Sequence, residues 1–306
     1  MAKPTSVKGL NSQTPVTEAA KLWMEARLAD VRRHGEAVQR EHDRDAIHDL
    51  RVASRRLRAA LRLFDEGGAL RGDERRVKHL QDALGSVRDT HVQLDRASGL
   101  KEGAGDKALL AGLREDLELE LAHCSAELLP ALERFLRHDL PRLEHRLPRL
   151  QPKGKLGGHR MREHLRQRLG QLEAWVEEAM PALDVAAAHR LRVATKRLRY
   201  ELELLEPGLG AMADLLLWLT SLQDSLGELH DLDVQLDNLL MVRVMRRPGD
   251  MEAPSLLEHE LLGAREEAAA KVRPGLEKLL RERGFKALRA ALKHPEALAE
   301  PPGNPQ

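Results

Sequence analysis

The chain has 306 residues, which is enough for two domains of about 150 residues each. Aromatic residues make up 2% of it and charged residues 32%, and this composition predicts an all-α fold. A formal net charge of +1 argues against a broad surface for nucleic acid or anionic membranes. The single cysteine excludes an intramolecular disulfide, and the longest apolar run, 215–219, is far shorter than the roughly 20 residues that span a bilayer. We therefore expect a soluble, cytoplasmic protein.

Helical periodicity, interrupted by glycine and proline, divides the chain into a leader, two helical halves, a linker and a tail. We place a flexible leader at 1–16, the first half at 17–150, the linker at 151–158, the second half at 159–293 and the tail at 294–306. We expect four main helices in each half, at 17–40, 44–64, 73–98 and 106–137, then at 159–179, 184–205, 212–244 and 255–283, followed by a short helix at 285–292.

Two motifs occur once in each half at almost the same spacing. The first motif, His48–Arg58, returns 141 residues later as His189–Arg199 and keeps its histidine, four basic positions and its apolar framework. The second motif, Leu-Gln-Asp-x-Leu-Gly-x-x-x-Asp, begins at Leu80 and returns 142 residues later at Leu222. A repeat of about 140 residues is far longer than a solenoid unit. We therefore predict two pseudo-symmetric four-helix bundles that arose by internal duplication.

The first motif predicts an amphipathic helix with one cationic face. At about 100° per residue, a row of basic side chains falls within a sector of about 80°, opposite an apolar face that seats in a bundle core. The row spans about 15 Å from His48 to Arg58, which suits a linear polyanion better than a single phosphate. Arginine adds bidentate phosphate contacts and a charge that does not depend on pH. The row contains His48, Arg51, Arg55, Arg58 and Arg62, and in the second half it is repeated by His189, Arg192, Lys196 and Arg199. The apolar face opposite the first row contains Leu50, Ala53, Leu57, Ala60, Leu61 and Phe64.

Several neighbouring residues are given structural roles. Asp45 and Asp184 are expected to cap the two helices, so the two motif histidines lie near a helix end that favours anions. Glycines in the second motif, at 85 and 227, predict a close approach of helices. Two basic residues fall off the row, and we expect them to pair with aspartates of the second motif: Arg56 and Arg197 with Asp89 and Asp231, or with Asp82 and Asp224.

The two paired motifs resemble those of the CHAD domain, a family named for conserved histidines in an α-helical domain. The resemblance covers roughly 17–292 and implies two four-helix bundles around a basic cavity or groove that binds inorganic polyphosphate, as in proteins found on polyphosphate granules. It implies a stand-alone, non-catalytic member without a cofactor, since the first helix begins near 17 and leaves no room for the triphosphate-tunnel domain of some members. The binding positions that it implies are His48, Arg51, Arg55, Arg56, Arg58, His189, Arg192, Lys196, Arg197 and Arg199, to which the helical row adds Arg62.

Two other functions stay open from the sequence. Fourteen histidines suggest a metal-dependent phosphoesterase, but none are spaced i,i+3 or i,i+4, so His48 and His189 would have to build the site across the halves. An arginine row also attracts nucleic acid, yet Tyr200 is the only aromatic residue beside it, which gives little support to base stacking. We expect inorganic polyphosphate as the partner and no membrane partner. A duplicated chain suffices as a monomer, and a dimer is left open.

Overall fold

The computed structural model describes residues 4–41, 43–100, 107–209, 213–246 and 256–281, together with Phe285, Arg289 and Leu292. Its regular structure within these residues is helical, apart from one isolated bridge between Pro15 and Lys155, so the predicted all-α fold is confirmed. The helices are α1 (Val16–Glu41), α2 (Arg44–Phe64), α3 (Arg71–Gly99), α4 (Lys107–Arg134), α5 (Leu140–Arg146), α6 (His159–Ala179), α7 (Val185–Leu209), α8 (Ala213–Arg246) and α9 (Leu256–Arg281). The predicted helix at 285–292 lies largely outside the described residues, and the predicted tail lies wholly outside them.

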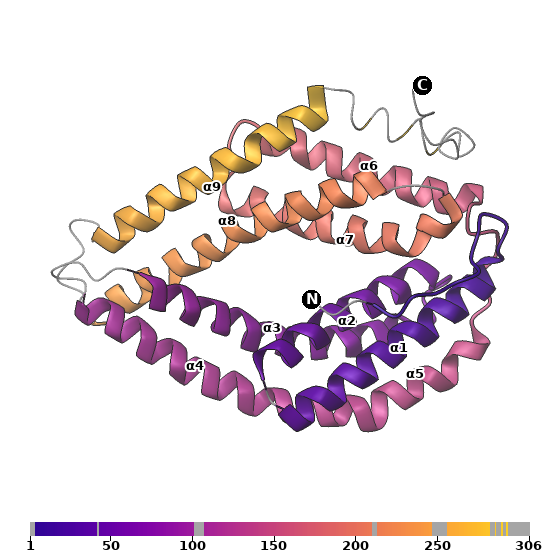
Figure 1. Cartoon of the computed structure of the whole chain (residues 1–306), viewed down its shortest axis with the longest axis horizontal. Helices are drawn as coiled ribbons and strands as arrows, with labels where there is room; N and C mark the ends of the chain where they lie inside the picture. The colour runs from indigo at the N-terminus through magenta and orange to yellow at the C-terminus, as the bar shows by residue number, and fades with distance from the viewer. Residues whose placement is uncertain are drawn as a thin grey trace, which may run out of the picture.

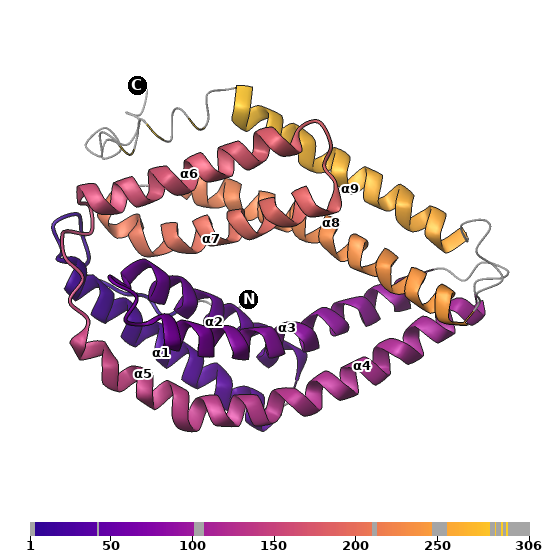
Figure 2. The same cartoon turned by 180° about the vertical axis from the view of Figure 1, so that it is seen from behind.

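The helices form two sets on opposite sides of the molecule (Figure 1). Helices α1 to α5 make the first set and α6 to α9 the second, and the view from behind shows the same division (Figure 2). Contacts between the sets join α2 to α7, and α8 to both α3 and α4. The first motif lies on α2 and α7, and the second on α3 and α8, so both motifs lie on helices of the boundary. The pseudo-symmetry of the sets stays a prediction from the sequence.

Helix α2 shows how the sequence positions this boundary. All six residues of its predicted apolar face are buried, as the helical period requires, and Leu57 and Phe64 are fully enclosed. Burying a leucine or phenylalanine side chain contributes roughly 1.5–3 kcal/mol, so this face fixes the rotation of the helix. The opposite, cationic face is then directed away from the core of the first set. The described helices include none that is long and apolar enough to cross a membrane.

The chain stays helical beyond the predicted end of α4 at residue 137. A π-helical turn (Phe135–Asp139) leads into α5, and a 3-10 turn (Leu147–Arg149) follows. Pro141 and Pro148 suggest helix ends in the sequence, but each lies in the first turn of its element, where a backbone N–H is not required. The linker that joins the two sets therefore starts only after residue 149.

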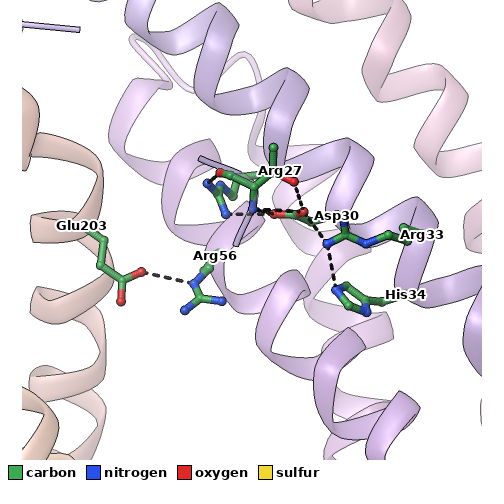
Figure 3. Close-up of polar contacts among 7 residues, drawn as sticks. Arg27, Asp30, Arg33, His34, Arg56 and Glu203 are labelled. Carbon is green, nitrogen blue, oxygen red and sulfur yellow. Dashed lines mark hydrogen bonds and ion pairs between the residues drawn. The ribbon is translucent and has the colours of Figure 1, made fainter. Parts of the chain in front are cut away.

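The segment before α1, predicted as a flexible leader, is anchored by hydrogen bonds. Thr5 Oγ1 donates to Asp30 Oδ1 at 2.6 Å, and Arg27 Nη2 donates to the Thr5 carbonyl at 2.6 Å. Asp30 is buried and is neutralised by Arg27 and Arg33, each at 2.9 Å (Figure 3). Further along, the Leu156 N–H of the linker donates to the Thr14 carbonyl at 2.8 Å. The leader thus packs against both α1 and the linker.

Candidate functional site

Each motif helix begins at an aspartate cap. The side chain of Asp184 accepts a hydrogen bond from the Ala187 N–H at 2.7 Å, which confirms the predicted cap of α7. For α2 the prediction of Asp45 is wrong, because Asp43 accepts from the Ala46 N–H at 2.6 Å. Each donor lies three positions after its cap, which is the usual spacing for satisfying a free N–H of the first turn.

Four basic side chains from the two sets meet at the boundary between α2 and α7. Burial lowers the pKa of Arg192 and Lys196 on α7 and of Arg51 on α2, and the positive charge of Arg55 on α2 is the second cause for each of them. The charge of Arg192 also lowers the pKa of Arg51. Charges that influence one another's pKa in this way lie near one another in a partly buried environment, as the contact between α2 and α7 allows. We call these four residues, Arg51, Arg55, Arg192 and Lys196, the cation cluster.

The cation cluster contains more positive charge than its carboxylates neutralise. Asp89 of α3 pairs with Arg51 at 2.9 Å. Within the described residues, Arg55, Arg192 and Lys196 make no ion pair, and the buried Nε atoms of Arg51 and Arg192 have no hydrogen-bond partner. Buried polar groups are normally satisfied, and an anion here would both satisfy these donors and offset the positive charge around them.

Within the cation cluster, the charged form is most strongly disfavoured at Lys196. Burial, followed by the charges of Arg55, Arg192 and Arg51, lowers the pKa of Lys196 to about 6, although Asp89 opposes the shift. Burial is also the main reason that the pKa of Arg51 falls to about 10. Lys196 is therefore mostly uncharged at pH 8 in the empty protein, and a bound anion would favour its protonated form.

Two histidines border the cluster on the second set. His189 of α7 lies against His230 of α8, with 5.7 Å between the ring centroids. Burial and then Arg192 lower the pKa of His230 to about 4, and Lys196 also contributes. The sequence analysis missed His230. The duplication contains a signal for it, because His230 aligns with the basic residue Arg88 in the first copy of the second motif.

On the first set, His48 is half-buried and stands near Arg88. Burial is the first cause of its lowered pKa, and the charge of Arg88 is the second. A basic residue of the second motif thus lies beside the motif histidine in each half, as Arg88 does for His48 and His230 for His189. Both predicted histidines therefore lie near other basic groups, although neither belongs to the cation cluster itself.

The remaining predicted basic residues are held by carboxylates. Arg58 and Arg62 both pair with Glu74 of α3, and Arg62 Nη2 lies 2.6 Å from it. Arg199 pairs with Glu203 at 2.9 Å and donates to Gln223 at 2.9 Å. The row on each helix is therefore divided into a cation-rich part at the boundary and a part in which each arginine pairs with a carboxylate, with Glu74 shared by Arg58 and Arg62.

Arg56 and Arg197 have partners that the sequence analysis did not propose. Arg56 reaches across the boundary to Glu203 at 3.2 Å, and Figure 3 shows the two residues on separate helices. Arg197 pairs with Glu201 of its own helix at 3.1 Å, so its predicted pairing with an aspartate of the second motif is wrong. A neighbour at i,i+4 is already in reach on a helix, whereas a partner on another helix requires a particular packing.

Glu201 is the centre of a second ionic network. It is almost fully buried, and His164 Nε2 and Arg168 Nε approach its carboxylate at 2.9 and 3.2 Å. Burial, the largest single effect, acts to raise the pKa of Glu201. The hydrogen bond with His164 and the surrounding positive charges together outweigh it, so the pKa is lowered. The network ties α6 to α7 and so fixes the helix that carries Arg192 and Lys196.

The glycines of the second motif do not mark close helix–helix contact, so this prediction is wrong. A Cβ atom at Gly85 would first meet Arg51 Nη2 at 3.7 Å, and one at Gly227 would meet no described atom within 4 Å. Gly85 thus borders the Arg51 guanidinium rather than a helix backbone.

Replacing Gly227 with alanine is expected to stabilise the protein by about 0.5–1 kcal/mol. The added methyl group has free space, and alanine favours a helix interior over glycine by about this amount. Urea denaturation of Gly227→Ala checks the prediction. A lower unfolding free energy than that of the unmodified protein would instead show tight packing around residue 227.

Comparisons with known proteins show which family and which solved folds the chain resembles. The family model described as CHAD domain matches residues 23–240. The solved CHAD domain from the plant Ricinus communis is 26% identical to the chain, with a TM-score of 0.59 and 96% of each chain covered. The structure of PptA from Streptomyces chartreusis is 17% identical, with a TM-score of 0.59 over 93% of this chain and 100% of that one, and shows a shared fold. No curated protein matches the chain. Because the family model covers more than half of its residues, the chain belongs to the CHAD domain family.

Proposed function

We propose that the protein binds inorganic polyphosphate, without catalysis, at the cation cluster. The observation that carries this proposal is a set of basic side chains from both helix sets, Arg55, Arg192 and Lys196, that make no ion pair within the described residues. A linear chain of phosphates has repeated negative charges that one bound molecule can present to both sets at once. Membership of the CHAD domain family supports the same ligand.

The partly buried cluster favours such a ligand for physical reasons. Guanidinium groups bind phosphate oxygens through paired hydrogen bonds, and these bonds strengthen where water is partly excluded. Phosphate also opposes the repulsion between the three arginines and the protonated form of Lys196, and it satisfies the Nε donors of Arg51 and Arg192. The carboxylate-paired residues Arg56, Arg58, Arg62, Arg197 and Arg199 would reach phosphate only by exchanging their present partners.

Binding and hydrolysis assays test this function directly. We expect long-chain polyphosphate to bind, to outcompete duplex DNA, and to lose affinity steeply as salt rises because bound counterions are released. We expect no release of phosphate, with or without added Zn²⁺ or Mn²⁺. Tighter binding of DNA would favour nucleic acid as the ligand, and metal-stimulated phosphate release would favour a phosphoesterase.

We also propose that binding places the protein on polyphosphate granules in the cytoplasm, and that a monomer is sufficient. A fluorescent fusion should colocalise with stained granules, and a variant with a disabled cation cluster should be diffuse. Granule association that survives loss of the cluster would point to a protein partner instead.

A further inference from the structure

A second basic cavity lies on the first helix set, away from the cation cluster. It has a volume of about 540 Å³ and is bordered by α3, the end of α4 and the π-helical turn. None of its bordering residues belongs to the cation cluster. Its volume falls within the roughly 300–1,000 Å³ that is usual for small-molecule sites. The bordering residues are Gly72, Arg75, Arg76, His79, Leu80, Pro130, Ala131, Arg134, Phe135 and Asp139.

The cavity has an excess of positive charge. Arg76 neutralises its one acidic residue, Asp139, at 3.2 Å. Arg75, His79 and Arg134 are exposed at the rim, and within the described residues none of them forms an ion pair. Two permanent cations and a titratable histidine therefore surround an opening in which no carboxylate is left unpaired. An anionic group is the ligand that such a rim favours.

The walls of the same cavity are apolar. Leu80 and Phe135 are almost completely buried below it, and Pro130 and Ala131 form the side on α4. The π-helical turn begins at Phe135, directly after Arg134, and so sets both a wall residue and a rim residue. π-Helical turns occur frequently at functional sites. Leu80 and Phe135 are already covered by the protein itself, so Pro130 and Ala131 form the accessible apolar side. A purely inorganic anion would leave this side uncovered, whereas an anion that carries a ring would cover it.

The cavity is not part of the duplicated architecture. At the offset of the second motif, Arg75, Arg76 and His79 correspond to Leu217, Trp218 and Ser221, so the second half lacks these basic residues. The cation cluster, in contrast, takes residues from both copies of the first motif. The cavity with these basic residues is therefore a feature of the first half alone, independent of the first motif that occurs in both halves.

We propose that this cavity is a separate binding site for a small organic phosphate, of the nucleoside diphosphate class. The phosphates would contact the rim cations Arg75, His79 and Arg134, and the ring would lie against the apolar wall. The proposal is independent of polyphosphate binding at the cation cluster.

Isothermal titration calorimetry with ADP tests the site. We expect wild-type protein to bind ADP more tightly than either pyrophosphate or adenosine. Pyrophosphate lacks the ring that would lie against the apolar wall, and adenosine lacks the phosphates that would contact the rim cations. The double variant Arg75→Glu, Arg134→Glu should bind ADP at least about tenfold more weakly. A control of equal net charge, Lys271→Glu, Arg190→Glu, alters surface residues that pair with Glu228 and Glu178 on the second helix set and border neither site, and it should bind ADP as wild type does.

Three results would overturn the proposal: no binding of ADP by the wild type, equal affinity for pyrophosphate and ADP, or unchanged ADP affinity in the cavity variant. A third variant separates this site from the cation cluster. Arg55→Glu, Arg192→Glu should keep its ADP affinity while losing polyphosphate. Loss of ADP binding in that variant would place ADP at the cation cluster and contradict a separate site.

Discussion

Replacing Arg55 and Arg192 together with glutamate is expected to weaken polyphosphate binding at least about 100-fold. Each residue belongs to a different helix set, and neither has a carboxylate partner within the described residues. A hydrogen bond to a charged group contributes about 1.5–3 kcal/mol, so two lost contacts reach this factor before repulsion is added. Fluorescence anisotropy with end-labelled polyphosphate measures the effect, and circular dichroism checks that the variant keeps its helices.

The control for this experiment is the double variant Arg137→Glu, Arg190→Glu. It changes the net charge by the same amount but alters exposed residues that pair with Glu133 and Glu178. A general attraction between protein and polyanion would weaken equally in both double variants, and this outcome would contradict a specific site. Arg62→Glu should have a smaller effect, since Arg62 already pairs in the empty protein with Glu74, which it shares with Arg58.

Polyphosphate binding is expected to take up a proton at Lys196. In the empty protein the pKa of Lys196 is lowered to about 6, by burial first and then by Arg55, Arg192 and Arg51. Bound phosphate opposes these causes and moves the pKa back toward the ordinary value of about 10.4. Above pH 6 the complex therefore carries a proton that the free protein lacks, and affinity should fall by up to about tenfold per pH unit as pH rises from 6 to 8.

Lys196→Gln isolates this contribution from the other titrating groups. Asp89, His230 and Asp231 also interact with Lys196, and phosphate itself titrates, so the comparison is between the pH slopes of variant and wild type. The variant should bind more weakly at pH 6 and show the shallower slope. Calorimetry in buffers of different ionisation enthalpy measures the proton uptake. Equal uptake by both proteins at pH 7.5 would contradict the assignment to Lys196.

The same variant tests whether the cation cluster costs stability. Lys196 has a lower pKa in the folded protein than in the unfolded chain, so the folded state binds fewer protons between about pH 6 and the unfolded pKa. The contribution of Lys196 to the free energy of unfolding therefore rises with pH across that window and is lowest below pH 6. Lys196→Gln should raise the melting temperature most at the acidic end, which is the pattern expected where function opposes stability.

Most of the helical architecture is predictable from the sequence because local patterns determine it. Helix α2 begins and ends at its predicted residues, and its apolar face is buried as its period requires. The extension through residues 135–149 is not predictable in this way. Pro141 and Pro148 favour a break, and only the packed chain shows that each falls in a first turn.

The candidate site is predictable in its residue types but not in its pairing. The repeat alone selects the basic positions, including all four members of the cation cluster. It does not reveal that Glu203 of one half neutralises Arg56 of the other, since this pair joins residues far apart in the chain. Local spacing can suggest the pair of Arg197 with Glu201, because both lie one turn apart on one helix face.

The central claim is that one polyphosphate chain binds to cations from both helix sets at once. A crystal structure of the protein with a polyphosphate of defined length tests it most directly. We predict phosphate oxygens within hydrogen-bonding distance of both Arg55 and Arg192, with the Asp89–Arg51 pair beside them. Phosphates bound to only one helix set, or bound away from the boundary between α2 and α7, would contradict the claim.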